Sequence, residues 1–213
     1  MKTDDLISLL ATADPGVDTG ALARRIGLAL LGGALGALLL MASLYGVRPD
    51  LAQVAGTPLF WAKLALPGSL ALLALWLCSR LARPGVKGGV AWGLLALPVV
   101  LVWVGGAVAL AGVPAEARPE LVLGRTWRTC ALNIGLLAVP TLAAITWALR
   151  GLAPVRLGQA GAAAGLLAGT TSALAYSLHC PEMGVPFWGV WYLLGMLLPT
   201  VLGAVLGPRL LRW

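Results

Sequence analysis

The chain has 213 residues, 60% of them hydrophobic and only 11% charged, which is too little charge to cover the surface of a soluble domain of this size. Its net charge of +7 comes from short clusters of Lys and Arg between apolar segments, and no long basic stripe with interleaved aromatic residues indicates a nucleic-acid partner. The composition therefore excludes a soluble globular protein and indicates a protein built for a lipid bilayer.

The opening residues predict a short amphipathic helix within a polar, cytoplasmic segment, residues 1–25. Residues 3–13 begin with Thr3, a plausible N-cap, and Pro15 ends the pattern. Acidic residues occupy the first turn, where the helix dipole favours negative charge, and leucines follow at the spacing of one helix face. The candidate partner-binding residues are Asp4, Asp5, Leu6, Leu9 and Leu10. A helix this short needs a covering surface, which could be the membrane, the protein's own loops or a groove on a basic soluble partner.

Apolar stretches of about 20 residues, the length that a helix needs to cross the hydrocarbon core, recur along the rest of the chain. Short connections separate them and leave no room for a soluble domain. We therefore predict an all-α fold, a polytopic membrane bundle of six transmembrane helices that forms one domain, residues 26–213. The predicted spans are 26–45, 57–77, 90–112, 128–148, 158–178 and 186–207.

The distribution of Lys and Arg predicts that both termini are cytoplasmic, because basic residues are enriched on the inner side of a membrane. The predicted cytoplasmic residues are Lys2, Arg24, Arg25, Arg80, Arg83, Lys87, Arg150, Arg156, Arg209 and Arg212. The predicted outer ones are fewer: Arg48, Arg118, Arg125 and Arg128.

Residues inside the predicted spans indicate packing rather than transport. Gly161, Gly165 and Gly169 recur every fourth residue and predict a close approach between helix backbones. Lys63 is the only charged residue well inside a span, and it lies near enough to the outer end to extend its ammonium group to the lipid headgroups. Without further charges near the midplane, an ion or proton path is disfavoured.

Two cysteines are predicted to lie together at the outer face. Cys130 opens the fourth span and Cys180 follows the fifth, in a compartment where bacterial disulfides persist. They could form a static disulfide, remain inert thiols, act as a redox sensor, or share a soft metal ion with His179 and Glu182.

Cys130 is expected to be the more reactive of the two. It lies near a helix N-terminus with Arg125 and Arg128 close in sequence, and both factors favour the thiolate. Cys180 follows a helix C-terminus, where the dipole opposes the thiolate unless a cation or a metal compensates.

Several short stretches together match the pattern of one bacterial membrane family. They are Met1 to Ile7, Arg48 to Leu51, Trp127 to Cys130, Ala175 to Glu182 and Arg209 to Trp213. Together with the six-span plan, they make the chain resemble the NrsF-type membrane anti-sigma factors over essentially its full length.

The resemblance implies a regulator rather than an enzyme. Such a protein holds an extracytoplasmic-function (ECF) sigma factor at the bacterial inner membrane until a stress is sensed outside. By position, residues 1–13 would bind the sigma factor, and Cys130 and Cys180 would sense an oxidant or a metal. No cofactor is obligatory, a thiophilic metal ion could be the signal, and the partners are the sigma factor and the lipid bilayer, not nucleic acid.

Two other classes of function compete with this interpretation. A small transporter or metal-handling membrane protein is disfavoured by the lack of midplane charges. A thiol–quinone oxidoreductase would need a C-x-x-C pair and a quinone site, whereas this chain has one cysteine in each loop.

Overall fold

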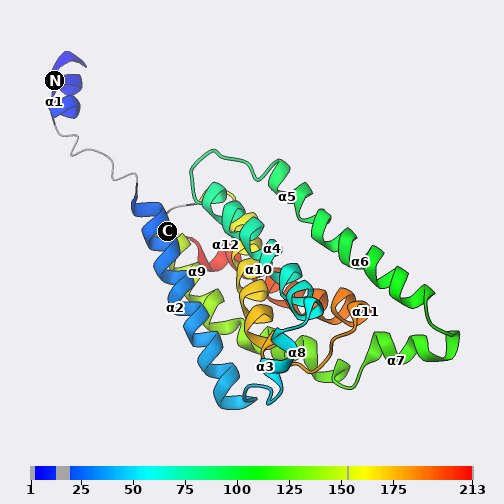
Figure 1. The fold of residues 1–213 in the computed structure, drawn as a ribbon. Coiled ribbons are helices and arrows are strands. Elements are labelled where there is room, and N and C mark those ends of the chain that lie inside the picture. Colours follow the sequence, from blue (N-terminus) through cyan, green and yellow to red (C-terminus); the bar gives the residue numbers. More distant parts are fainter. Residues whose placement is uncertain (1–2, 13–19, 153, 213) are drawn as a thin grey trace.

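The computed structural model describes residues 3–12, 20–152 and 154–212, and within these ranges the chain is helical with no strand (Figure 1). The all-α prediction is therefore confirmed. The elements are α1 (Thr3–Thr12), α2 (Ala21–Leu44), α3 (Leu51–Ala55), α4 (Pro58–Leu81), α5 (Val90–Leu94), α6 (Ala96–Ala111), η1 (Ala115–Ala117), α7 (Arg118–Leu123), α8 (Trp127–Leu137), α9 (Val139–Arg150), α10 (Leu157–Ser177), α11 (Val185–Phe187), the π-helical turn η2 (Trp188–Tyr192) and α12 (Leu193–Leu210).

Five helical stretches in the described part of the chain are long and apolar enough to cross a membrane, so the chain is a membrane protein. They are Ala21–Leu44, Pro58–Leu81, Val90–Ala111, Ala115–Arg150 and Val185–Leu210. These stretches contain or closely match five of the six spans expected from the sequence. The expected span 128–148 is divided into two helices, α8 and α9. The second helix, α9, begins beside Pro140, which lacks the N–H group that an uninterrupted helix would use.

The remaining predicted span corresponds to α10, which has the length for a crossing but not the apolarity. Its sequence is rich in Ala, Gly, Thr and Ser, and most of its residues are buried. Helices α2, α4, α8, α9 and α12 all pack against it. Because these neighbours screen α10 from its surroundings, its surface needs small residues for packing more than large apolar ones.

Glycines bring α10 and α12 into close contact, as the four-residue spacing predicts. A Cβ atom added at Gly161 or Gly165 would collide with a backbone oxygen of α12, and one at Gly169 would lie 2.8 Å from another. The three oxygens belong to Gly203, Pro199 and Met196, respectively. Larger side chains at these positions would force the two backbones apart.

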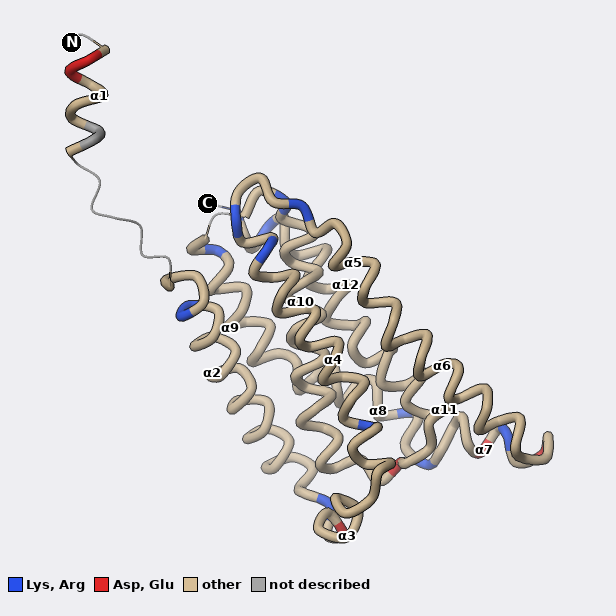
Figure 2. Tube along the Cα trace, turned by 45° about the horizontal axis from the view of Figure 1, so that its top comes forward, with Lys and Arg blue, Asp and Glu red and all other residues tan. Residues whose placement is uncertain are grey.

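Charged residues separate along the long axis of the bundle (Figure 2). Lys and Arg collect at the end where α2 begins and where α4 and α12 finish, whereas α3 and α7 lie at the opposite end. The core likewise divides into two buried clusters. One includes Leu77 and Ile145, and the other includes Cys130 and Cys180.

Candidate functional site

Cys130 and Cys180 meet in the interior at the end of the bundle that has fewer basic residues. Cys130 lies in the first turn of α8, and Cys180 lies in the loop that follows α10. Both side chains are 0% exposed, and both are free thiols. They share a buried cluster with the rings of Tyr176, Trp188 and Tyr192. Residues 50 positions apart in sequence thus form one compact site, which we call the thiol pair.

The loop over the thiol pair, residues 178–184, leaves carbonyl groups that need donors. The end of α10 closes with the Cys180 N–H donating to the Tyr176 carbonyl at 2.9 Å. Pro181 then stops the helix, because it has no N–H to continue the pattern. The carbonyl oxygens of Cys180 and Glu182 therefore lie outside the helical ladder, and other elements must supply their partners.

Lys63 supplies two of these hydrogen bonds. Its Nζ donates to the carbonyl oxygens of Cys180 at 2.8 Å and Glu182 at 2.9 Å, and it lies 5.5 Å from the centre of the Tyr192 ring. The side chain is 0% exposed, so the expectation that Lys63 extends to the headgroups is wrong. The Lys63 side chain points toward the 178–184 loop, and its hydrogen bonds to the two loop carbonyl groups offset the cost of burying its charge.

Arg48 is a second cation that donates to the carbonyl oxygen of Cys180. Its Nη1 donates to the Cys180 oxygen at 3.2 Å, and its backbone N–H donates to the Leu178 oxygen at 3.1 Å. The Asp50 carboxylate accepts from Nε at 2.7 Å and from Nη2 at 2.8 Å, and this pairing raises the pKa of Arg48 and lowers that of Asp50. Both groups therefore stay charged, and the loop is attached to the segment that follows α2.

Glu182 connects the loop to the start of α8. Its Oε1 accepts hydrogen bonds from the backbone N–H groups of Arg125 at 2.7 Å and Thr126 at 3.2 Å. The carboxylate thus caps the helix that contains Cys130, in the position where the helix dipole favours negative charge. Gly124 permits this contact, because its φ is +56° and a Cβ atom there would lie 2.7 Å from Glu182 Oε2.

The metal set expected from the sequence is not assembled. His179 Nδ1 lies 3.0 Å from the Gly46 oxygen, and its ring lies against those of Tyr45 and Tyr176, while Glu182 caps α8. In the part of the chain that the structure describes, no group of three or more His, Cys, Asp or Glu side chains could hold a metal ion. A soft ion at this site would have only the two sulfurs of the thiol pair as ligands.

The environment favours the thiolate at Cys180 rather than at Cys130. A hydrogen bond from the Cys130 thiol and the nearby Lys63 ammonium lower the pKa of the Cys180 thiol, although burial opposes this shift. Arg128, one of the two arginines expected to activate Cys130, lies over the Trp127 ring instead, with its Cζ 5.2 Å from the ring centre. The sequence signal for this arrangement was Lys63 itself, a lone cation inside a span, which usually marks a site within the bundle.

The candidate partner-binding residues lie on α1, which stands apart from the bundle in Figure 1. Asp4 and Asp5 occupy its first turn. The side chains of Leu6 and Leu9 are 43% and 60% exposed. The side chain of Leu10 and residues 13–19 lie outside the described part of the chain. The described apolar residues of α1 are thus open to a partner.

The chain is similar to known proteins over its whole length. A family model described as "NrsF: Negative regulator of sigma F" matches residues 10–213. The "Probable anti-sigma-F factor NrsF" of Azospira oryzae is 45% identical over 213 residues, which cover 100% of both chains. The "Anti-sigma-F factor NrsF" of Caulobacter vibrioides is 42% identical over 221 residues, again covering 100% of both. No solved structure matches the chain significantly.

Proposed function

The chain belongs to the NrsF family, the negative regulators of sigma F, and on that premise we propose that it is a membrane anti-sigma factor that sequesters an ECF sigma factor. The observation that carries the proposal is full-length similarity to two proteins named as anti-sigma-F factors. These relatives are regulators rather than enzymes. In such a regulator the exposed helix α1 would bind the sigma factor, and the thiol pair at the far end of the bundle would detect the stress.

The proposed membrane arrangement is six spans in the bacterial inner membrane, with both termini in the cytoplasm. The sixth span is α10, whose position among five other helices accounts for its low apolarity. The collection of Lys and Arg at one end of the bundle supports the orientation, since basic residues are enriched on the cytoplasmic side (Figure 2).

The proposed docking element is α1 within the cytoplasmic segment 1–25. A partner groove would receive the apolar side chains of Leu6, Leu9 and Leu10, and basic groups at its rim would face Asp4 and Asp5. Because an isolated helix of 10 residues is marginal in water, binding would also stabilise α1 itself.

The proposed sensor is the thiol pair. A two-electron oxidant would accept two electrons while the two thiols lose two protons and form one disulfide bond. A soft metal ion would instead displace the protons and bridge two thiolates. Either reagent requires the 178–184 loop to open first, because both sulfurs are 0% exposed.

The proposed coupling runs from the thiol pair along the helices that contain or precede it. Cys130 lies in the first turn of α8, and α9 continues from α8 toward the basic end of the bundle. Cys180 follows α10, whose first residue, Leu157, lies toward that same end. To move sigma-factor occupancy from about 99% to about 1%, the two thiol states would need to differ by about 5.5 kcal/mol in binding free energy. Partial release needs less.

Sigma-dependent transcription in cells tests both halves of the proposal. The full-length protein should co-purify with a sigma factor, and Cys130→Ser or Cys180→Ser should abolish induction by an oxidant or a thiophilic metal while repression persists. Cys78→Ser is the matched control, because Cys78 is buried in the other core cluster. Normal induction in both sensor variants would remove the thiol pair from the mechanism, and failure to recover any sigma factor would contradict the anti-sigma role.

A further inference from the structure

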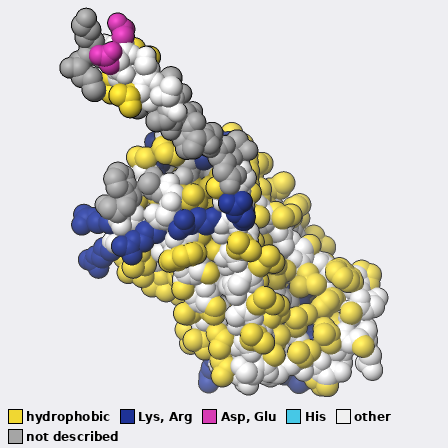
Figure 3. Space-filling model, turned by 90° about the vertical axis from the view of Figure 1, so that its left-hand side faces the viewer, with side chains coloured by type: hydrophobic (Ala, Val, Ile, Leu, Met, Phe, Trp, Pro, Cys, Tyr) yellow, Lys and Arg dark blue, Asp and Glu magenta, His cyan; other side chains and the backbone are white. Residues whose placement is uncertain are grey.

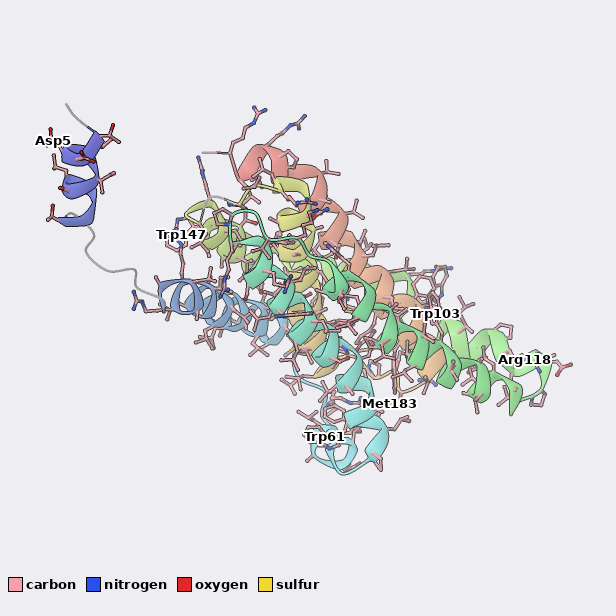
Figure 4. All side chains as sticks on the ribbon, turned by 90° about the horizontal axis from the view of Figure 1, so that it is seen from above. Asp5, Trp61, Trp103, Arg118, Trp147 and Met183 are labelled. Atoms are coloured by element: carbon pink, nitrogen blue, oxygen red, sulfur yellow. The ribbon has the colours of Figure 1, made fainter. Side chains whose placement is uncertain are left out.

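A groove between α2 and α9 lies at the basic end of the bundle and has a cavity volume of about 510 Å³. Its lining combines guanidinium groups, an indole ring and aliphatic carbon: Arg24, Arg25, Leu28, Gly32, Ala144 and Trp147. Figure 3 shows the side of the molecule that contains α2, with a band of Lys and Arg side chains above a largely hydrophobic surface. Trp147 lies far from Met183 in Figure 4, so the groove is remote from the thiol pair.

Arg25 is held in the groove by contacts with Trp147. Its Cζ lies 5.0 Å from the centre of the Trp147 ring, and one Nη lies 3.5 Å from the Trp147 carbonyl oxygen. Its Nε is buried and has no hydrogen-bond partner among the described residues. Gly151 makes room for the guanidinium, since a Cβ atom there would collide with it. A buried N–H without an acceptor is costly, so a small movement of the Arg25 side chain toward an acceptor in the groove would be favourable.

The charges of the groove specify an anionic ligand. Arg24 adds a second positive charge next to Arg25, and none of the lining residues is acidic. The planar guanidinium fork matches the oxygens of a phosphate group, which can accept two of its N–H groups at once.

The walls of the groove specify that the ligand also has an apolar tail. Leu28 is 65% exposed, and a Cβ atom at Gly32 would meet no other atom within 4 Å, so this part of the groove is open. Helix α2 is one of the candidate membrane spans, and its apolar face continues away from the arginines. The exposed indole of Trp147 marks the depth that tryptophan prefers, between headgroups and hydrocarbon.

We propose that this groove binds an anionic phospholipid, with its phosphodiester on Arg25 and Arg24 and an acyl chain along Leu28 and Gly32. The phosphodiester would pair with the two guanidinium groups, and the acyl chain would fill the open space beside Gly32. It would also join α2 to α9 at the point where the chain leaves the membrane toward α1. This site is independent of the sigma factor and of the thiol pair.

Native mass spectrometry of the full-length protein in detergent, titrated with phosphatidylglycerol, tests the site. Arg25→Gln should weaken binding of the first lipid about fivefold, the effect of one basic group at a membrane surface. Because Arg25 also contacts Trp147, Gly32→Leu gives a second variant that fills the groove without touching that contact. Gly27→Leu is its matched control, since a Cβ atom at Gly27 also meets nothing within 4 Å but Gly27 does not line the groove.

The expected result is weaker phosphatidylglycerol binding in Arg25→Gln and Gly32→Leu, unchanged binding in Gly27→Leu, and little binding of phosphatidylcholine. Equal affinity for the two lipids, or equal losses in Gly32→Leu and Gly27→Leu, would overturn the proposal. The competing occupant is the acidic helix α1. If α1 fills the groove, changing Asp4 and Asp5 to Asn will strengthen lipid binding, and that outcome would also overturn the proposal.

Discussion

At the scale of single residues, Lys63 is central because its ammonium group joins α4 to the loop over the thiol pair. It donates to two carbonyl groups that no helix can satisfy, and Arg48 donates to one of them from another side. These bonds close the loop over sulfurs that have no exposed surface. The rate at which a reagent reaches the thiols should therefore depend on how often the loop opens.

Replacing Lys63 with Met should increase loop opening. The variant removes the Lys63 donor from the carbonyl oxygens of Cys180 and Glu182, which keep only their bonds from Arg48 and from the Trp188 indole. Each lost bond to the charged ammonium costs about 1.5–3 kcal/mol. Hydrogen exchange of the amides in residues 178–184 should become more than tenfold faster.

Lys87→Met is the control for this experiment, because Lys87 is exposed and lies in the loop after α4, at the opposite end of the bundle. Unchanged exchange in Lys63→Met would mean that other contacts alone keep the loop closed.

Residue-level features of the site were only partly predictable. The sequence places Cys130 and Cys180 at the same level because each lies at the end of a span, and the structure joins them. The directions in which the neighbouring side chains point were not predictable. His179 and Glu182 flank Cys180 in sequence, but His179 contacts the Gly46 oxygen and Glu182 binds the backbone at the start of α8. The distance of Lys63 from the end of its span shows that the side chain is long enough to reach the headgroups, but it does not show which side of the helix faces the interior.

At the scale of elements, α1 is the one amphipathic helix of the described chain that lies away from the bundle (Figure 1). Its first turn is acidic and its exposed leucines share one face. These features separate partner binding from membrane packing, so substitutions in α1 should leave the rest of the fold intact.

Single Leu6→Ala and Leu9→Ala changes should each weaken sigma-factor binding by about 1–3 kcal/mol, because buried apolar side chains dominate such interfaces. The double change to Asp should release the sigma factor without any stress. Ser8→Asp is the control for added negative charge, since it places one carboxylate on the opposite face of α1.

Pull-down of the sigma factor with the full-length protein in detergent measures these effects. If the double Asp variant binds as tightly as the unaltered chain, the docking site lies outside α1.

Among the elements, the long apolar helices were predictable because hydrocarbon thickness imposes their length. The division between α8 and α9 and the short helices α3 and α7 were not predicted, since they depend on local turns rather than on a repeated pattern. For α10, hydropathy alone is insufficient, because its small residues are explained by contacts with α12 that only the structure shows.

At the scale of the whole molecule, the bundle has a basic end and a thiol end (Figure 2). Arg118, the first residue of α7, lies at the tip of the molecule (Figure 4), and Lys87 lies in the loop after α4. The proposed orientation puts these two exposed residues on opposite sides of the membrane.

Labelling with an impermeant thiol reagent should distinguish the two sides. In a chain whose three native cysteines are changed to Ser, Arg118→Cys should react in intact cells, and Lys87→Cys should react only after permeabilisation. The reverse pattern would invert the orientation, and labelling of both positions in intact cells would rule out the six-span arrangement.

The central position of α10 also has a consequence for how the protein is made. Its small residues give it a weak tendency to partition from the translocon into lipid on its own. Helix α12, with which it interlocks through glycines, is synthesised only later. Nascent chains that end at Gly184 should therefore insert residues 157–177 inefficiently, and glycosylation mapping should show full insertion only once α12 is present. The bundle therefore cannot close around α10 before α12 has been synthesised.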